Sequence, residues 1–280
     1  MKQSTKTFSF CNQKGGVGKT TSAINLATAI AQSGQEVLLI DVDPQGNATS
    51  GLGIEKSKNL TTLYTVLIGQ AELNQAVIET EIERLRIIPA NSDVSGAEIE
   101  LISLPEREFQ LRKAIESIKN QYDFVFIDCP PSLGLLTINA LSASDYILIP
   151  LQCEYYALEG LGQLLETYSL VKKNLNPTLE IGGVLLTMAD FRTKLTEQVI
   201  DEVRNYFKEK VFNSIIPRSV RLSEAPSFGK PGIVYDKFSR GAKSYLEAAK
   251  EFLERFKTSE NLQKESVVQE EIPTIKGETR

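Results

Sequence analysis

Residues 14–21 read Lys-Gly-Gly-Val-Gly-Lys-Thr-Thr, a glycine-rich stretch that ends in Lys-Thr-Thr. A run rich in β-branched and aromatic residues precedes it at residues 7–11, and a helical pattern follows over residues 19–32. Glycines let backbone N–H groups point inward at a polyphosphate, and the N-terminus of a helix adds its partial positive charge. The order of strand, glycine-rich loop and helix therefore predicts a loop that binds the phosphates of a nucleoside triphosphate.

The side chains of this loop have separate expected roles. Lys19 would contact the β and γ phosphates, the Thr20 hydroxyl would ligate Mg²⁺, and Thr21 would reach the α phosphate. Lys14 is a departure, because an ordinary phosphate loop does not require a lysine before its two glycines; on the residues alone, a solvated side chain is the simpler interpretation. The loop expected to bind the nucleotide comprises Lys14, Gly15, Gly16, Val17, Gly18, Lys19, Thr20 and Thr21.

Three aspartates stand at the ends of apolar runs. Asp41 and Asp43 close the run at residues 36–43, and Asp128 closes the run at residues 124–128. An open α/β sheet places its ligand site at the carboxyl ends of its strands. Oxygen ligands suit Mg²⁺, and a nearby carboxylate can orient an attacking water. We expect these carboxylates near one Mg²⁺, with capping of the next helix or turn as the alternative for each.

Short apolar runs alternate with helical patterns along the whole chain. Several runs are apolar throughout, as strands covered on both faces by helices require. The expected fold is therefore α/β, with a doubly wound, mostly parallel sheet and helices on both faces. We expect one domain over residues 1–257 and a polar, disordered tail over 258–280. Strands are expected at residues 7–11, 36–41, 85–88, 124–128, 146–150 and 181–187, and helices at 19–32, 104–120, 133–143, 158–174, 196–208 and 242–256.

The composition excludes several classes of site. The chain has no histidine, which removes histidine metal sites and Ser-His-Asp triads. Its three cysteines stand singly, without a Cys-x-x-Cys pair, and are expected in or near the core. No apolar run approaches the roughly 18 residues of a membrane span, so we expect a cytoplasmic protein.

Charge is segregated along the sequence. The chain has a net charge of −5, yet residues 192–257 hold 14 basic and nine acidic residues. Such an excess is usually a solvated face. If it binds DNA, the contacts would be with phosphates, and binding would be independent of sequence and sensitive to salt.

The motif at residues 14–21 resembles the deviant Walker A motif of the MinD/ParA superfamily of P-loop NTPases. The resemblance is closest to the ParA/Soj family of chromosome and plasmid partition ATPases, and it covers roughly residues 7–256. Matching segments are LIDVDPQGN at 39–47, FIDCPPS at 126–132, QCEYYALEG at 152–160 and IPRSVRLSEAP at 216–226.

The resemblance implies a Mg²⁺-dependent ATPase that converts ATP and water into ADP and phosphate. It implies a homodimer in the ATP state that binds nonspecific double-stranded DNA on the nucleoid. It also implies a ParB-like, centromere-binding partner that stimulates hydrolysis.

The resemblance also assigns roles to individual residues. By their positions in the motifs, Lys14 would reach across the dimer to the partner's ATP, and Asp43 would position or activate the hydrolytic water. Asp128 matches the Walker B aspartate. The implied catalytic residues are Lys14, Lys19 and Asp43; the metal residues are Thr20, Asp41 and Asp128; Pro217 and Arg218 lie near adenine; and Arg192 and Arg221 bind DNA.

The main alternative is a MinD-like ATPase that associates with membranes through a basic amphipathic C-terminal helix. An apolar stripe over residues 245–256 favours it, although such a stripe can also pack on its own domain. An iron–sulfur relative would need cysteine pairs that this chain lacks. A scaffold that binds nucleotide without hydrolysing it is a further alternative, against which Asp43 argues.

Overall fold

The computed structural model describes residues 4–57, 60–155, 157 and 159–256. Within these residues, seven strands form one sheet in the order β3-β4-β2-β5-β1-β6-β7. All neighbouring strands are parallel except β3 and β4, which are antiparallel. The strands are β1 (Lys6–Phe10), β2 (Val37–Asp41), β3 (Ile78–Glu79), β4 (Leu85–Ile88), β5 (Phe124–Asp128), β6 (Tyr146–Gln152) and β7 (Glu180–Thr187).

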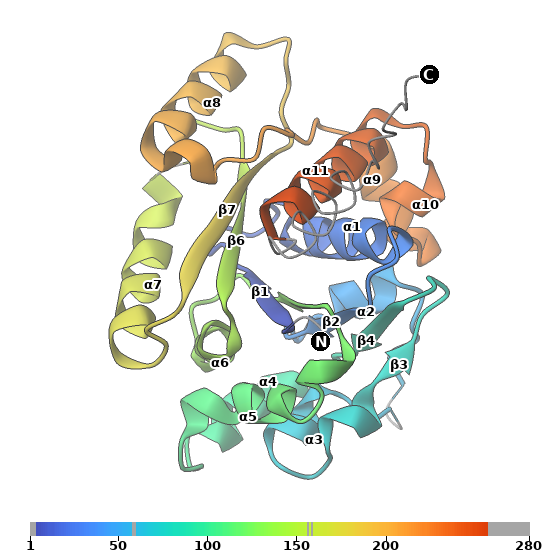
Figure 1. Cartoon of the computed structure of the whole chain (residues 1–280), viewed down its shortest axis with the longest axis vertical. Helices are drawn as coiled ribbons and strands as arrows, with labels where there is room; N and C mark the ends of the chain where they lie inside the picture. The colour runs from blue at the N-terminus through green and yellow to red at the C-terminus, as the bar shows by residue number, and fades with distance from the viewer. Residues whose placement is uncertain (1–3, 58–59, 156, 158, 257–280) are drawn as a thin grey trace, which may run out of the picture.

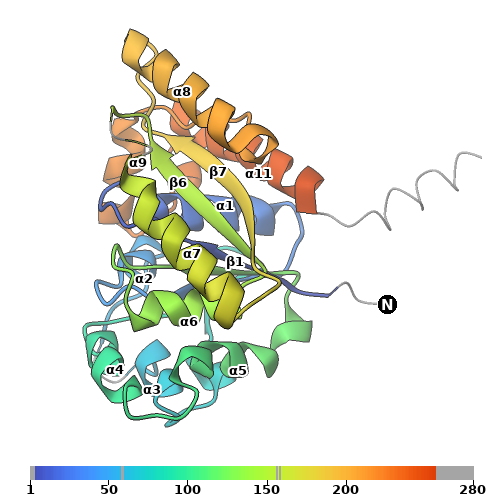
Figure 2. The ribbon, with the colours of Figure 1, turned by 90° about the vertical axis from the view of Figure 1, so that its left-hand side faces the viewer.

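Helices cover both faces of this sheet. Figure 1 shows α1 and α11 on one side and α4, α5 and α6 on the other, and in Figure 2 α7 runs alongside β6 and β7. The predicted doubly wound α/β fold is confirmed. The helices are α1 (Lys19–Gln32), α2 (Asn47–Gly51), α3 (Leu63–Leu67), α4 (Val94–Leu101), α5 (Gln110–Glu116), α6 (Leu135–Ala143), α7 (Gly162–Asn174), α8 (Lys194–Phe207), α9 (Val220–Glu224), α10 (Gly232–Tyr235) and α11 (Arg240–Phe256), with 3₁₀ turns η1 (Leu73–Ala76), η2 (Arg107–Phe109), η3 (Lys119–Gln121), η4 (Glu159–Leu161), η5 (Lys208–Lys210) and η6 (Ala225–Phe228).

The apolar stripe of α11 packs inside the domain. The Phe252 ring lies 4.8 Å from the Phe8 ring of β1 and 5.4 Å from the Phe126 ring of β5, measured between centroids. Tyr245 and Phe256 are also buried. The stripe is therefore part of the core, and it no longer favours a membrane-binding helix. No helix in the described part of the chain has the length and apolarity to span a bilayer.

Several elements differ from expectation. The helix expected at 104–120 begins only at α5, because Glu106 adopts φ 50°, which a right-handed helix cannot contain, and it ends before the 3₁₀ turn η3. The short helices α2, α3, α9 and α10, together with α4 and β3, were not expected, because elements of a few residues give little periodic signal. The proposed single domain over 1–257 stays a prediction, and the tail at 258–280 lies outside the described residues.

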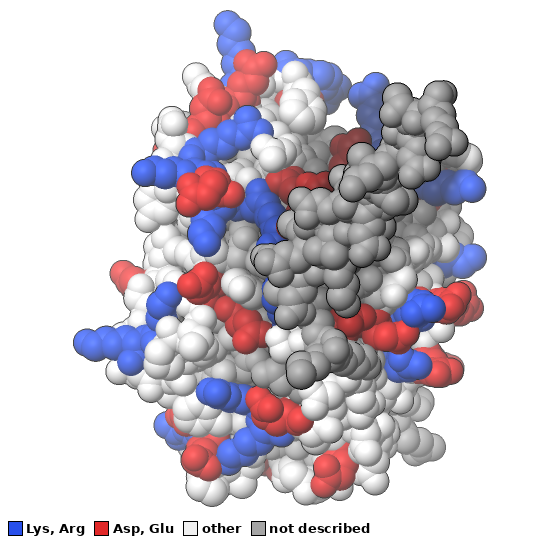
Figure 3. Space-filling view, viewed as in Figure 1, with Lys and Arg blue, Asp and Glu red and all other residues white. Residues whose placement is uncertain are grey.

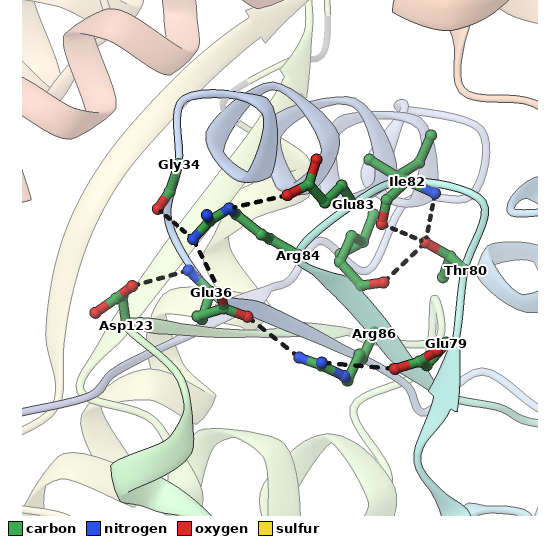
Figure 4. Close-up of polar contacts among 10 residues, drawn as sticks. Gly34, Glu36, Glu79, Thr80, Ile82, Glu83, Arg84, Arg86 and Asp123 are labelled. Carbon is green, nitrogen blue, oxygen red and sulfur yellow. Dashed lines mark hydrogen bonds and ion pairs between the residues drawn. The ribbon is translucent and has the colours of Figure 1, made fainter.

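The amino ends of the strands are held by the polar network drawn in Figure 4. The Glu36 carboxylate accepts hydrogen bonds from Arg84 at 3.1 Å and from Arg86 at 3.2 Å. The Glu36 backbone N–H donates to Asp123 Oδ2 at 2.8 Å. These contacts join the turn after α1 to β4 and to the start of β5, at the edge of the sheet opposite the loop at 14–21.

All three cysteines are buried, as predicted. Cys11 and Cys129 follow neighbouring strands, and their sulfur atoms lie 3.2 Å apart. Burial raises the pKa of the Cys129 thiol well above its usual value and that of Cys153 to about 11. The thiols therefore behave as small core side chains.

Candidate nucleotide-binding site

The loop between β1 and α1 has the backbone that phosphate binding requires. Gly16 and Gly18 adopt φ 74° and 88°, which side-chain-bearing residues rarely adopt. A Cβ atom added at Gly15 or Gly16 would meet no atom within 4 Å, so both glycines face open space. The loop leads directly into α1, whose first residue is Lys19. The loop is therefore an open cradle at a helix N-terminus.

Neighbouring strands hold this loop in place. Thr187, at the end of β7, donates a hydrogen bond from Oγ1 to the Val17 carbonyl at 2.8 Å. Asn12 donates to the Pro150 carbonyl at 2.8 Å and accepts from the Lys14 backbone N–H at 3.0 Å. The cradle is thus held in place by β6 and β7.

The two lysines of the loop lie in different environments. Lys19 is only 7% exposed, and its Nζ donates to the Lys14 carbonyl at 3.2 Å. Burial lowers the pKa of Lys19, and the nearby Asp128 opposes this shift. The Lys14 ammonium instead forms an ion pair of 2.7 Å with Glu154, and its side chain is 44% exposed. The structure separates a buried cation inside the cradle from a half-exposed one at its rim.

Two adjoining cavities open above the cradle. The larger has a volume of about 420 Å³, and the smaller has about 270 Å³ and contains Pro217 and Arg218. Met188 borders both and adopts φ 53°, an uncommon conformation for a residue with a side chain. The larger cavity is lined by residues that include Gly15, Gly16, Gly18, Lys19, Thr20, Thr21, Asn25, Asp43, Gln45, Pro131, Lys230, Pro231 and Gly232.

Asp41 is engaged with α2. Its Oδ2 accepts hydrogen bonds at 2.8 Å from both the N–H and the hydroxyl of Thr49, and its Oδ1 accepts from the Asp43 N–H at 3.2 Å. Burial raises the pKa of Asp41 to about 6, against the effect of these hydrogen bonds. The contacts therefore show Asp41 capping the helix α2, which was the alternative to a metal ligand. A metal role for Asp41 stays a prediction.

Asp128 has the opposite character. It lies beside Asp41 in the sheet, is fully buried, and neither carboxylate oxygen has a hydrogen-bond partner in the described structure. Burial, followed by the charge of Asp41, raises its pKa well above the usual value; Thr20 and Lys19 act in the opposite direction. A cation placed beside such a buried carboxylate would stabilise its charged form. Asp128 and Thr20 therefore fit a Mg²⁺ ion.

Asp43 faces the larger cavity from a tight turn. Its Oδ1 accepts from the Gln45 N–H at 2.9 Å, and its carbonyl accepts from the Gly46 N–H at 2.8 Å. Gly46 is required there, since its φ is 60° and an added Cβ would lie 2.6 Å from the Ala90 carbonyl oxygen. The turn therefore places Asp43 in the wall of the cavity that Lys19 and Thr20 also line.

The expected DNA-binding arginines lie outside both cavities. The side chain of Arg192 is 88% exposed and pairs with Asp190 at 2.6 Å, which lowers the pKa of that carboxyl to about 2. Arg221 on α9 pairs with Glu224 at 3.0 Å and with Asp236 at 3.4 Å. Figure 3 shows basic and acidic side chains interspersed on the visible face. Each arginine is therefore balanced by an acid of its own chain.

Sequence reasoning missed Met188, Asn25 and Lys230 as cavity residues. Met188 directly follows β7, so its place at the carboxyl edge of the sheet is a signal that was available. Asn25 and Lys230 are brought together only by the packing of α1 on the C-terminal helices, which no local pattern reports.

Replacing Thr49 by valine is expected to destabilise the fold by about 2 kcal/mol. The variant keeps the shape of the side chain but removes the hydroxyl that donates to Asp41 and accepts from the Ala90 N–H at 2.9 Å. A buried donor and a buried carboxylate would then each lose a partner. Urea denaturation without nucleotide measures the effect.

Thr28→Val is the matched control. Thr28 is also fully buried, but its hydroxyl donates only to the Ile24 carbonyl within α1, at 2.8 Å. Its loss is expected to cost less than about 1 kcal/mol. Equal effects of the two substitutions would contradict the special role of Thr49.

Comparison with known proteins identifies relatives over nearly the whole described chain. A family model described as an AAA domain matches residues 5–181. Sporulation initiation inhibitor protein Soj of Bacillus subtilis (strain 168) is 58% identical over 88% of this chain and 97% of that protein. Chromosome partitioning protein ParA of Myxococcus xanthus (strain DK1622) is 54% identical over 87% of this chain and 86% of that protein.

A solved structure shares the fold. Cobyrinic acid a,c-diamide synthase from Mycobacterium smegmatis, with a bound ATP analogue and magnesium, has a TM-score of 0.80 and 37% sequence identity. The likeness covers 91% of this chain and 97% of that one. The two proteins therefore share the fold over most of their lengths.

Proposed function

The chain belongs to the ParA/Soj family of chromosome-partitioning ATPases, and we propose that it binds ATP and Mg²⁺ in the cradle at residues 14–21 and hydrolyses ATP to ADP and phosphate. The observation that carries this proposal is the buried Lys19 beside the unpartnered Asp128. The ATP analogue and magnesium of the mycobacterial structure support the choice of ligands. That protein bears the name of another reaction, but Soj and ParA share more of the present sequence.

The residues of the cradle divide the work of phosphoryl transfer. Lys19 and the N–H groups of residues 15–18 hold the phosphates, and Thr21 contacts the α phosphate. Asp128 and Thr20 would hold Mg²⁺, and Asp41 would lie near the ion. The bound ion would neutralise part of the negative charge of the phosphates. Asp43 orients the attacking water. Pro217 and Arg218, in the smaller cavity, border the adenine.

Lys14 acts across a homodimer in this proposal. Its ammonium is half-exposed and held by a carboxylate rather than by the cradle of its own chain. The γ phosphate of the ATP bound to a facing protomer would replace Glu154 as the partner of Lys14. The Lys14 ammonium would then stabilise the negative charge that develops during hydrolysis. ATP would in this way join the two subunits.

DNA binding belongs to the same proposal. Arg192 and Arg221 contact phosphates of nonspecific double-stranded DNA, so each must exchange an acid of its own chain for a DNA phosphate. The dimer doubles the number of phosphates neutralised and makes DNA affinity depend on ATP. A ParB-like, centromere-binding protein then stimulates hydrolysis of ATP. In this proposal the ATPase itself is cytoplasmic and associated with the nucleoid.

DNA binding is expected to be strongest with ATP, weaker with ADP or no nucleotide, and steeply reduced by salt. Arg192→Glu is expected to lower affinity by about tenfold or more at low salt, because it replaces a phosphate contact by repulsion in both subunits. Fluorescence anisotropy of a labelled duplex, at two salt concentrations and with each nucleotide, measures both effects.

Arg112→Glu provides the matched control, since Arg112 is an exposed arginine on α5, on the other side of the sheet. It makes the same charge change and should leave DNA affinity nearly unaltered. Binding that ignored nucleotide, or an equal loss in both variants, would contradict the proposed DNA surface. Co-sedimentation with anionic vesicles in place of DNA would point to the MinD-like alternative.

A further inference from the structure

We propose that Asn25 is a positioning residue that transmits nucleotide occupancy from the phosphate loop to Arg221 through α10. The inference rests on the proposed function, because it concerns how ATP alters the DNA-binding segment. It is carried by a continuous series of polar contacts between two regions about two hundred residues apart.

The first contacts belong to Asn25 itself. This amide is 2% exposed and lies one turn after Thr21, which lines the nucleotide cavity. Its Nδ2 donates to the Thr21 carbonyl at 2.8 Å, and its Oδ1 accepts from the Ile233 N–H at 3.0 Å. The N–H of Ile233 stands in the first turn of α10, where helical N–H groups have no partner within the helix. One side chain therefore joins the first turn of α1 to the first turn of α10.

The next contacts run along α10 to the basic segment. Asp236 directly follows α10, and its Oδ2 lies 3.4 Å from Nε of Arg221. Because α10 has only four residues, it moves as a unit, and a shift of its first turn also shifts Asp236. One of the two ion pairs of Arg221 thus depends on a helix whose start is set by Asn25, whereas the pair with Glu224 lies within α9.

Packing allows little slack in this arrangement. A Cβ added to Gly232 would lie 3.2 Å from Asn25 Oδ1 and 2.4 Å from Leu222 of α9. A displacement of the Asn25 amide toward α10 is therefore passed on rather than absorbed. The buried amide also needs both partners, since an unsatisfied amide in this position would be costly.

In the inferred sequence of events, phosphate binding shifts the first turn of α1 and, with it, the Thr21 carbonyl. Asn25 then fixes the start of α10, and the repositioned Asp236 releases Arg221 to a DNA phosphate. In the structure Arg221 pairs with Asp236 and Glu224, and we infer that both pairs persist when no nucleotide is bound.

Hydrogen exchange of the α10 amides, with and without a nonhydrolysable ATP analogue, tests the proposal in the absence of DNA. In the wild type, a saturating analogue is expected to slow exchange over residues 232–236. Asn25→Ser keeps a hydroxyl that can bond the Thr21 carbonyl but is too short to reach Ile233. In this variant the α10 amides are expected to exchange faster and equally with and without analogue, each measured at saturation.

Ser22→Ala is the matched control. The Ser22 hydroxyl is buried on α1 and bonds the Tyr245 hydroxyl of α11 at 2.9 Å, so its loss also removes one buried contact between α1 and the C-terminal helices. In the Ser22→Ala variant, the ATP analogue should still slow hydrogen exchange of the α10 amides. A wild type whose α10 amides ignore the analogue, or an Asn25→Ser variant that keeps the response, would overturn the proposal.

Asp236→Asn tests the last contact. The amide can still accept the Phe238 N–H, now made to Asp236 Oδ1 at 3.1 Å, but it no longer ion-pairs with Arg221. DNA affinity without nucleotide is expected to rise severalfold, and an unchanged affinity would remove Arg221 from the series. If the wild type bound no DNA with any nucleotide, the proposed DNA function would fail, whereas the exchange experiment would still decide the role of Asn25.

Discussion

Lys19→Ala is expected to lower the affinity for ATP by about a hundredfold or more. Lys19 is buried in the cradle, and its ammonium is placed to bond the β and γ phosphates, where charge-assisted hydrogen bonds are each worth about 1.5–3 kcal/mol. Titration with a fluorescent ATP analogue in the presence of Mg²⁺ measures the change.

The free protein should fold normally with this substitution. Lys19 makes one backbone hydrogen bond of 3.2 Å, and the variant no longer has to bury an ammonium group, which offsets that loss. Thermal denaturation without nucleotide should therefore give a similar midpoint for variant and wild type. A folded Lys19→Ala protein that bound ATP as tightly as the wild type would place the phosphates elsewhere.

Lys14→Ala is expected to lower ATP turnover on the order of a hundredfold or more while ATP binding is retained. The reason is that Lys14 would serve the ATP of the facing protomer, whereas Lys19 holds the ATP of its own. Asp43→Ala is expected to give a similar loss, because it removes the group that orients the water. Steady-state phosphate release, with nucleotide binding measured in parallel, separates turnover from affinity.

Mixing the two inactive variants tests whether Lys14 acts in trans. In a mixed dimer, the Lys14→Ala protomer keeps its own Asp43 and receives Lys14 from the Asp43→Ala protomer, so one of the two ATP sites is complete. The mixture should regain part of the wild-type turnover. Each variant alone, at the same total concentration, is the control. A mixture no more active than its components would show that Lys14 serves its own protomer.

Local pattern was enough for the fold and for the cradle. Strands such as β5 are buried on both faces, so their residues are apolar throughout, and the glycines of the loop are required by the φ angles that they adopt. Both features leave a signal within a few adjacent residues. The carboxyl edge of the sheet then followed from the parallel order of the strands.

The remaining features depend on contacts that sequence does not display. Asp41 and Asp128 both end buried strands, yet only the structure shows that Thr49 satisfies Asp41 while Asp128 has no partner. The acids that pair with Arg192 and Arg221 could not be foreseen from a count of charges. Asn25 contacts α10 through a hydrogen bond to Ile233, which is about two hundred residues away in the sequence, so no local pattern reports it.

The burial of all three cysteines also matters for fluorescence studies of this protein. Thiol-reactive dyes attack exposed thiolates, and burial raises the pKa of Cys129 and Cys153. A single cysteine introduced at the exposed Glu81, in the turn between β3 and β4, would be the preferred point of attachment. That turn lies at the amino edge of the sheet, away from the cradle, so a dye there can report where the protein is without touching the nucleotide.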